Sequence, residues 1–576
     1  MCEINNKRTA VGISCIAWML LIVPMVATAL TPVARAPSGA DAGSIQREVL
    51  QALPQGESQP VQIDIPTLPP LKEVAGLAVN VNQFIVTGNT AFESETLEAL
   101  LVGDAGSNKS FSDLQSAARK ISNYYRENGY PVARAYLPEQ ELDESGLVRI
   151  AIIEGVTGAV TIQGSEQLID WVGEDYASRL NKGDLINSAD LERALLLLND
   201  LPGVTAKANL KAGITKGSTD VDITLDESTT VTGFASANNY GTDFSGNYRL
   251  TGGANVNNLM GIGDKFTGVI LSSESAHTTY GSLGYSMPVG PLGTRVGVSY
   301  SKVDSEVGAE LRQLGIENEA DVWNINVTHP FIRSHNVNLV GQVSYTSKDI
   351  EETWGADFVA LDPTLGSEES LSIFAFGISG DLRDYGSYGA SFNTYSLSGD
   401  IGTIDFDSVT ASRIDAEDEY LKLNYDFSRL QRLHNDLVLY AHLRGQYSQD
   451  RLVTSEQKSL GGPHGVRAYG VGEGLADQSV LLSLEARYRL NLDSDVIRGS
   501  MVYGFIDAGH GRVNDALAGT TDEYNRSGYG VGIQFGFGYD PGMSLNANVA
   551  WNTQNDDDTN SGVNDQFWMQ FVKSFN

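Results

Sequence analysis

From Val231 to the C-terminus, apolar residues alternate with polar or small ones in many short runs. The clearest run has Leu482, Leu484, Ala486, Tyr488 and Leu490 on one side and Ser483, Glu485, Arg487 and Arg489 on the other. Successive side chains of a strand point to opposite faces, so each run predicts a β-strand with one apolar face. Such a strand suits a wall between lipid and water, and residues 231–576 have room for about sixteen of them.

The connections between these runs alternate in length. Tight connections are expected at 288–293, 331–336, 428–436 and 540–542, and long, mostly acidic ones at 301–321, 349–369, 458–477 and 552–565. Short turns at one rim and long loops at the other are typical of an outer-membrane barrel, whereas a soluble sandwich has short loops at both ends. The last segment places Phe567, Met569, Phe571 and Phe575 on one face, which predicts a closing strand.

Two smaller modules precede the barrel, at residues 79–155 and 156–228. Each has the order β-α-α-β-β, which predicts an α+β domain with its helices on one face of a sheet. Ser112 and Gln115 form an expected capping box for a helix in the first module, and Asn187 or Ser188 is expected to cap one in the second. Exposed sheet edges would accept an extended peptide, although the modules would also serve as simple spacers.

The N-terminus reads as a secretory signal, residues 1–29, and it contains both cysteines, Cys2 and Cys15. Residues 30–78 follow as a tethered helix and a proline-rich linker. Ile45, Val49 and Leu53 lie four residues apart and predict the helix, which Pro54 ends. A disordered leader is the alternative for this segment. Beyond the signal, no apolar stretch is long enough for a membrane helix.

Composition narrows the function. A net charge of −33 disfavours nucleic acid as a partner. The seven histidines show no metal-ligand spacing, and neither a nucleophile elbow nor a phosphate-binding loop occurs, so we expect no metal, no cofactor and no enzymatic activity.

The glycine-rich stretch 458–477 carries a single arginine, Arg467, close to Tyr469. Downstream, the stretch 504–509 holds one acid, Asp507, on the strand face opposite Gly504, Ile506 and Ala508. A carboxylate is tolerated better toward a barrel lumen than toward lipid. We therefore expect Arg467 and Asp507 to pair inside the barrel, against the alternative of a flexible surface loop and an unrelated acid.

The order of these parts resembles that of the outer-membrane transporters of two-partner secretion, which export haemolysins and adhesins and belong to the superfamily that also inserts outer-membrane proteins. The motifs that carry the resemblance are LLLLNDLPGV at 195–204, NNYGTDFSGNYRL at 238–250, GIGD at 261–264, VRAY at 466–469 and GFIDAG at 504–509. The family's loop usually reads VRGY, so Ala468 departs from it at a glycine.

The resemblance implies a monomeric barrel of sixteen antiparallel transmembrane strands in the outer membrane, in contact with its lipid. Two POTRA-like modules in the periplasm would bind a large β-helical exoprotein, which crosses the barrel unfolded. The residues implied for the lumen loop and its wall are Val466, Arg467, Tyr469, Phe505, Asp507 and Gly509, and the N-terminal helix would plug the pore. A barrel-assembly factor, a passive porin and an exported enzyme with a β domain remain as alternatives.

Overall fold

The computed structural model describes residues 42, 46, 62–64, 78–141, 145–164, 167–363, 365–386, 389–406, 416–492, 497–516, 520–538, 542–553 and 565–575. The expected signal, residues 1–29, lies outside them, as do Ile45, Val49 and Leu53. None of the helices in this described part of the chain is long and apolar enough to cross a membrane.

The first module has the expected order of elements with two further strands that the sequence pattern did not predict. It contains β2 (Ala78–Val81), β3 (Gln83–Thr87), α2 (Ser94–Ala99), β4 (Gly106–Ser110), α3 (Phe111–Glu127), β5 (Arg134–Tyr136) and β6 (Leu147–Ile153). Strand β6 lies in the middle of a three-stranded sheet, parallel to β3 and antiparallel to β5, while β2 and β4 form a separate pair.

The expected capping box of α3 is wrong by two residues. The helix begins at Phe111, and Ser110 is its N-cap. The Ser110 hydroxyl accepts a hydrogen bond from the Asp113 amide at 3.2 Å, and the Asp113 carboxylate accepts one from the Ser110 amide at 2.8 Å. Aspartate replaces the usual Glu or Gln at the third helical position, so the motif search at 112–115 selected the wrong serine.

A buried carboxylate orders the core of the first module. Glu154 accepts hydrogen bonds from the Thr90 amide at 2.7 Å, the Ala91 amide at 2.8 Å and the Tyr125 hydroxyl at 2.7 Å. Burial acts to raise the pKa of the Glu154 carboxyl, but these donors together outweigh it and lower that pKa below its ordinary value. These hydrogen bonds therefore keep the carboxylate charged inside the module.

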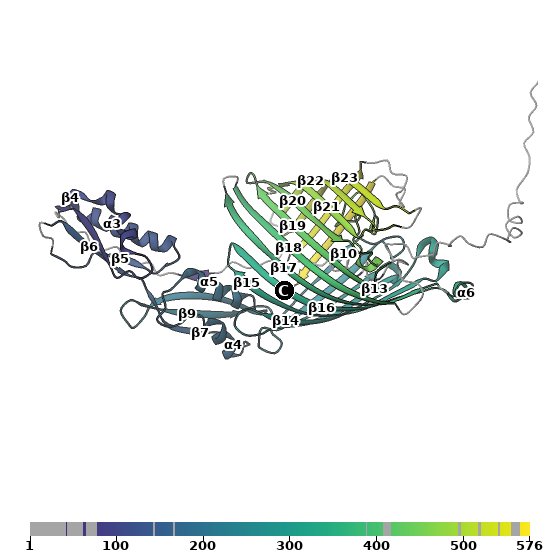
Figure 1. Cartoon of the computed structure of the whole chain (residues 1–576), viewed down its shortest axis with the longest axis horizontal. Helices are drawn as coiled ribbons and strands as arrows, with labels where there is room; N and C mark the ends of the chain where they lie inside the picture. The colour runs from purple at the N-terminus through teal and green to yellow at the C-terminus, as the bar shows by residue number, and fades with distance from the viewer. Residues whose placement is uncertain are drawn as a thin grey trace, which may run out of the picture. The chain divides into compact units, whose positions relative to one another are not determined.

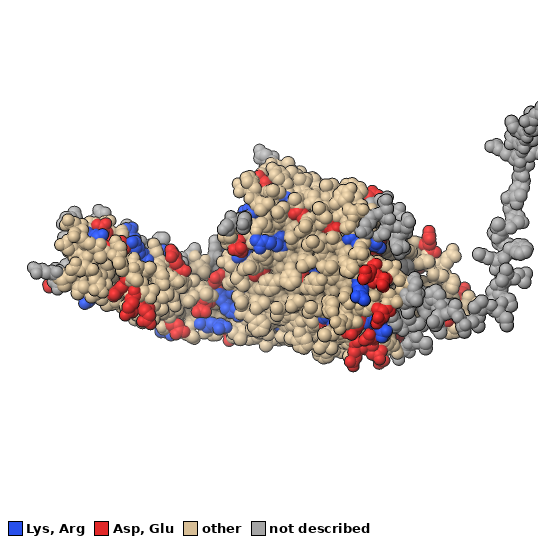
Figure 2. Space-filling view, turned by 45° about the horizontal axis from the view of Figure 1, so that its top comes forward, with Lys and Arg blue, Asp and Glu red and all other residues tan. Residues whose placement is uncertain are grey.

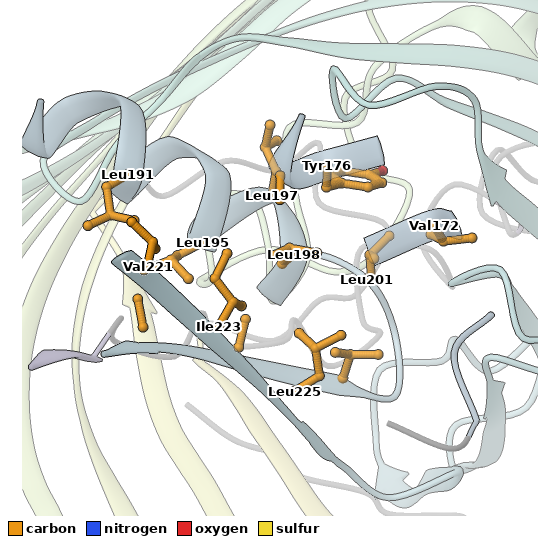
Figure 3. Packing of buried hydrophobic residues seen from close by; sticks show 14 of the residues in the cluster. Val172, Tyr176, Leu191, Leu195, Leu197, Leu198, Leu201, Val221, Ile223 and Leu225 are labelled. Atoms are coloured by element: carbon orange, nitrogen blue, oxygen red, sulfur yellow. The ribbon is translucent and has the colours of Figure 1, made fainter. Parts of the chain in front are cut away.

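The second module contains β7 (Val156–Gln163), α4 (Asp170–Ala177), α5 (Ser188–Asn199), β8 (Val204–Ala212) and β9 (Ser218–Glu227). Asn187 caps α5, since its side-chain oxygen accepts a hydrogen bond from the Ala189 amide at 2.8 Å. Figure 3 shows leucines of α5 pointing at Val221 and Ile223 of β9 across the module's apolar core. One helical face against one sheet face therefore holds this module together.

The linker contributes a strand that the sequence pattern did not predict. β1 (Gln62–Asp64) pairs in parallel with β8, with Gln62 opposite Lys207, so the sheet order is β1-β8-β9-β7. One expected free sheet edge of the second module is thus occupied by the chain itself.

The described strands from β10 onward form one closed barrel of sixteen antiparallel strands, as expected. They are β10 (Val231–Asn238), β11 (Arg249–Asn257), β12 (Lys265–Ser273), β13 (Thr278–Pro288), β14 (Arg295–Glu306), β15 (Glu317–Arg333), β16 (Val337–Thr353), β17 (Ser367–Gly386), β18 (Gly389–Phe406), β19 (Glu419–Arg432), β20 (Leu437–Ser448), β21 (Gln478–Arg489), β22 (Ile497–Arg512), β23 (Glu523–Phe537), β24 (Met543–Asn552) and β25 (Asp565–Phe575). A short helix, α6 (Ala356–Val359), lies between β16 and β17. Figure 1 shows neighbouring barrel strands running side by side with a common tilt.

The alternation along these strands separates an outer from an inner face. Leu482 and Leu484 of β21 are exposed on the outside. Glu485, the next residue along the strand, points to the other face and is buried. Figure 2 shows a broad uncharged area over the visible side of the barrel, with acidic and basic residues gathered toward its margins. An apolar band of this kind is what a lipid-facing barrel surface requires.

The expected long connections 301–321 and 349–369 are shorter in the structure because the flanking strands extend into them. β14 continues to Glu306 and β15 begins at Glu317, so much of 301–321 is strand. The expected tight connections 288–293, 331–336 and 428–436 each overlap the observed break between two strands, whereas most of 540–542 lies outside the described residues.

Candidate functional site: the loop inside the barrel

The glycine-rich loop, residues 458–477, joins β20 to β21 and folds back on itself. Lys458 and Ala476 exchange backbone hydrogen bonds of 3.0 and 3.1 Å at its root. Near its tip, the Val466 amide donates to the Leu460 carbonyl at 2.7 Å. A Cβ on Gly465 would lie only 2.2 Å from that carbonyl oxygen, so the fold of the loop requires glycine there. The loop is a compact structure and not an extended surface segment.

The structure brings Arg467 and Asp507 together at the tip of this loop. Arg467 Nε lies 2.8 Å from Asp507 Oδ2, and Arg467 Nη2 lies 2.8 Å from Asp507 Oδ1. The backbone amide of Arg467 donates to the same carboxylate at 3.1 Å. Asp507 is 1% exposed and Arg467 is 7% exposed, so this two-pronged pair is shielded from water.

The other residues expected at this site surround the pair. The Arg467 guanidinium carbon lies 3.5 Å from the centre of the Phe505 ring, a stacking arrangement that suits a planar cation. Val466, Tyr469 and Phe505 share one buried apolar cluster. A Cβ on Gly509 would lie 3.0 Å from Val466 Cγ2, so the absence of a side chain there makes room for the loop.

Sequence reasoning missed three contacts of the tip. Glu485 Oε1 accepts a hydrogen bond from Arg467 Nη1 at 2.7 Å, and Trp568 Nε1 donates to the Arg467 carbonyl at 2.7 Å. Ala468 packs against Gly528, where an added Cβ would lie 2.5 Å from that of Ala468. The alternation along β21 already puts Glu485 on the lumen face. The contacts of Trp568 and Gly528 depend on barrel closure, which no local pattern shows.

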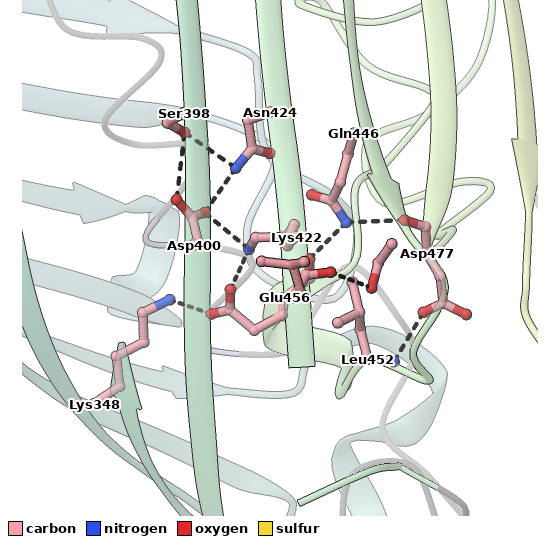
Figure 4. A network of polar contacts seen from close by, with 11 residues as sticks. Lys348, Ser398, Asp400, Lys422, Asn424, Gln446, Leu452, Glu456 and Asp477 are labelled. Carbon is pink, nitrogen blue, oxygen red and sulfur yellow. Dashed lines mark hydrogen bonds and ion pairs between the residues drawn. The ribbon is translucent and has the colours of Figure 1, made fainter. Parts of the chain in front are cut away.

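A second charged cluster holds the root of the loop, and no sequence motif indicated it. Figure 4 shows Glu456, just before the loop, between the side chains of Lys348 on β16 and Lys422 on β19. Lys348 Nζ lies 2.6 Å from Glu456 Oε1, and Lys422 pairs with Oε2. Lys422 Nζ also lies 3.7 Å from Asp400 Oδ2 on β18. The Glu456 side chain is 3% exposed, so this carboxylate depends on its two cations.

A cavity of about 360 Å³ remains between the loop and the wall. Its lining includes Lys348, Lys422 and Arg444 from the wall and Gly461 to His464 from the loop. This volume is at the small end of the range for small-molecule pockets. Within the described part of the chain, no three or more His, Cys, Asp or Glu residues gather as a metal site.

The N-terminal segment also reaches the barrel wall. Its two described residues, Ala42 and Gln46, are helical and buried. Gln46 Nε2 donates a hydrogen bond of 2.8 Å to Ser301 Oγ on β14, and Ala42 packs with wall residues such as Val303 and Ala320.

Comparison with known families decides the assignment. The model of the haemolysin secretion/activation proteins ShlB/FhaC/HecB matches residues 217–535, more than half of the chain. The chain belongs to this family. A ShlB-type POTRA domain model matches residues 79–155. The protein is thus a two-partner secretion transporter of the outer membrane, with POTRA domains in the periplasm and a large secreted exoprotein as its partner.

Relatives agree with this assignment over 74–93% of the chain. The Heme/hemopexin transporter protein HuxB of Haemophilus influenzae is 27% identical over 552 residues, covering 93% of this chain and 95% of HuxB. The outer membrane transporter CdiB of Dickeya dadantii is 22% identical over 432 residues, covering 74% of each chain. The solved structure of CdiB from Escherichia coli superposes with a TM-score of 0.65 at 18% identity, covering 92% of this chain and 95% of CdiB. Membership of a family of secretion proteins favours protein export as the function over the assembly-factor and porin alternatives.

Proposed function

We propose that the transporter binds its exoprotein through the two POTRA domains and passes it unfolded through the barrel after the loop has left the lumen. The observation that carries this proposal is the seated loop, anchored at its tip by Arg467 and at its root by Glu456. A loop fixed by two buried charge clusters keeps the resting pore closed, and export requires that it move.

We place recognition of the exoprotein on the edges of the POTRA sheets. In the first domain, β5 pairs with β6 on one side and ends the sheet. In the second domain, β1 from the linker covers the edge of β8. An extended segment of the exoprotein would add to β5 or take the place of β1 through backbone hydrogen bonds.

Deletion of residues 80–228 tests this division of labour. The truncated chain is expected to insert as a heat-modifiable barrel and to lose export, because the segment that receives the exoprotein is gone. Exoprotein in the medium and barrel heat-modifiability are measured together. Normal export by the truncated chain would reduce the POTRA domains to spacers.

We assign the N-terminal helix, residues 40–53, the role of a removable plug, with Ile45, Val49 and Leu53 on its apolar face. The burial of Ala42 and Gln46 against the barrel supports this role. Deleting 40–53 should raise single-channel conductance in planar bilayers while export continues, because a plug must leave before a chain passes. Unchanged conductance would contradict the assignment.

We further propose that the transporter acts as a single lipid-embedded barrel without enzymatic activity. Closure of the barrel by pairing of β10 with β25 supports the monomer, since all sixteen strands come from one chain.

A further inference from the structure

Exposed apolar side chains occur on both segments that meet where the second POTRA domain contacts a turn of the barrel. Ile169 and Trp171, at the start of α4, are 44% and 59% exposed. Leu259 and Met260, in the turn between β11 and β12, are 60% and 62% exposed. We call these four residues the rim patch. An exposed apolar group of this kind marks an interaction surface more often than four scattered residues do.

The two halves of the rim patch are fastened to each other. The Ile169 amide donates a hydrogen bond to the Gly261 carbonyl at 2.8 Å, and Asn258 Nδ2 donates to the Gln167 carbonyl at 3.1 Å. Gly261 has a φ of +76°, and a Cβ there would lie 3.2 Å from Ile169 Cγ1. Glycine thus allows the turn to approach α4 closely.

The turn itself is ordered by polar contacts that leave its apolar side chains outside. Asp264 Oδ1 accepts a hydrogen bond from the Met260 amide at 3.0 Å, and Asn258 Oδ1 accepts one from the Gly263 amide at 2.7 Å. These contacts order the backbone of the turn, and the side chains of Leu259 and Met260 are exposed on it.

The rim patch continues the lipid-facing surface of the barrel. The Tyr285 hydroxyl lies 3.5 Å from Met260 Sδ. Tyr285 lies on the same face of β13 as Leu283 and Met287, which are 55% and 38% exposed. That face meets lipid in an outer-membrane barrel, and tyrosine and tryptophan are enriched where lipid meets water.

We propose that the rim patch inserts into the interfacial region of the periplasmic leaflet and holds the second POTRA domain against the membrane. Lipid fits better than a protein partner because the patch is continuous with a surface that already contacts lipid. Asp170 and Glu174, which flank Trp171 on α4, are exposed, so their carboxylates would stay in water with the helix start at headgroup depth. Interfacial helices are buried only about 5–10 Å below the surface, which agrees with this arrangement.

A fluorescent probe at Trp171 tests the proposal in the full chain. The two cysteines precede residue 30, so a chain that begins at Leu30 and carries Trp171→Cys has one reactive thiol. The labelled protein is placed in vesicles of phosphatidylethanolamine and phosphatidylglycerol containing spin-labelled lipid. The matched control is Ile214→Cys, in the turn between β8 and β9, because Ile214 is also apolar and is fully exposed. This turn faces the first POTRA domain, since a Cβ on Gly217 would lie 3.3 Å from Ile153 Cγ2 of that domain.

Quenching by spin-labelled lipid should be at least ~2-fold stronger at position 171 than at position 214, as expected for a residue at the lipid interface. Met260→Cys, in the other half of the rim patch, should give the same result. It replaces Trp171→Cys as the test variant if that chain fails to insert as a heat-modifiable barrel. Equal lipid quenching at 171 and 214, with full access of both probes to aqueous iodide, would overturn the proposal. A probe at position 171 that is not quenched by spin-labelled lipid, but whose fluorescence changes when the exoprotein binds, would also overturn the proposal. That result would indicate a protein-docking surface.

Discussion

The tip and the root of the lumen loop are anchored by opposite arrangements of charge. At the tip, one cation, Arg467, lies between two acids, Asp507 and Glu485. At the root, one acid, Glu456, lies between two cations, Lys348 and Lys422. In both places the central charge is buried, so it is stable only while its partners stay in place. Opening either cluster therefore leaves a buried charge without its partners and weakens the anchoring of the loop at that end.

The two anchors also differ in geometry. The guanidinium of Arg467 presents two parallel donors to one carboxylate, so the tip fixes the direction of the loop. Lysine is a point charge without such a fork, and the root holds Glu456 through two strands, β16 and β19. The tip is bound to β21 and β22 instead. Movement of the loop thus releases contacts in two sectors of the barrel wall.

The largest effect is expected from removing the acid of the tip. Asp507→Ala leaves Arg467 buried with Glu485 alone, which should cost about 3–5 kcal/mol of loop anchoring. Loop protection from protease and export of the exoprotein should both fall. Arg467→Ala should have a similar effect, and the double variant should be little worse than either single one. Fully additive losses would show that the two residues act separately.

Glu456→Gln at the root should have a smaller effect, about 2–3 kcal/mol, because the amide oxygen still accepts a hydrogen bond and Lys422 keeps Asp400 nearby. Protease sensitivity should rise first around residues 453–458 and not at the tip. Lys348→Met is the matched partner variant. Combined with Glu456→Gln, it should raise protease sensitivity little more than either variant does alone. Since the anchors share no residue, Glu456→Gln and Asp507→Ala should add. Strong coupling between them would mean that the loop moves as one rigid body.

The sequence alone predicted the charge pair at the tip of the loop but not the charged cluster at its root, for a physical reason. Arg467 stands alone in a glycine-rich loop, and strand alternation places Asp507 on the lumen face, so each half of the pair has a local signal. Lys348 lies 108 residues before Glu456, and neither is part of a motif. Their contact exists only once the strands have closed into a barrel in one register.

The same limit explains the other differences. Most element types in the POTRA domains followed from periodicity, but β2 and β4 were not predicted. β1 was missed because three residues of a proline-rich linker become a strand only against the edge of β8. The capping box failed because two serines compete at the start of α3, and Asp113 decides for Ser110.

The Ala468 position gives a third, smaller test of how tightly the tip is packed. Gly528→Ala would place a methyl group against Ala468 Cβ, at 2.5 Å before relaxation, and 3.0 Å from the Trp551 carbonyl oxygen. Overpacking of this kind should cost ~1–2 kcal/mol in the thermal unfolding of the purified barrel. Combining it with Ala468→Gly should recover most of the loss. No recovery would place the strain at Trp551 instead of at the loop.

The smallest effect separates the centre of the tip anchor from its margin. Arg487 Nε lies 2.7 Å from Glu485 Oε2, but the Arg487 side chain is 27% exposed, against 9% for Arg467. A partly hydrated ion pair should contribute about 1 kcal/mol or less. Arg487→Gln should therefore leave export near normal and weaken loop protection only slightly, most visibly at low salt, where surface charges are screened least. A loss as large as that of Asp507→Ala would show that Glu485 needs both arginines, and that the tip anchor extends to the edge of the lumen.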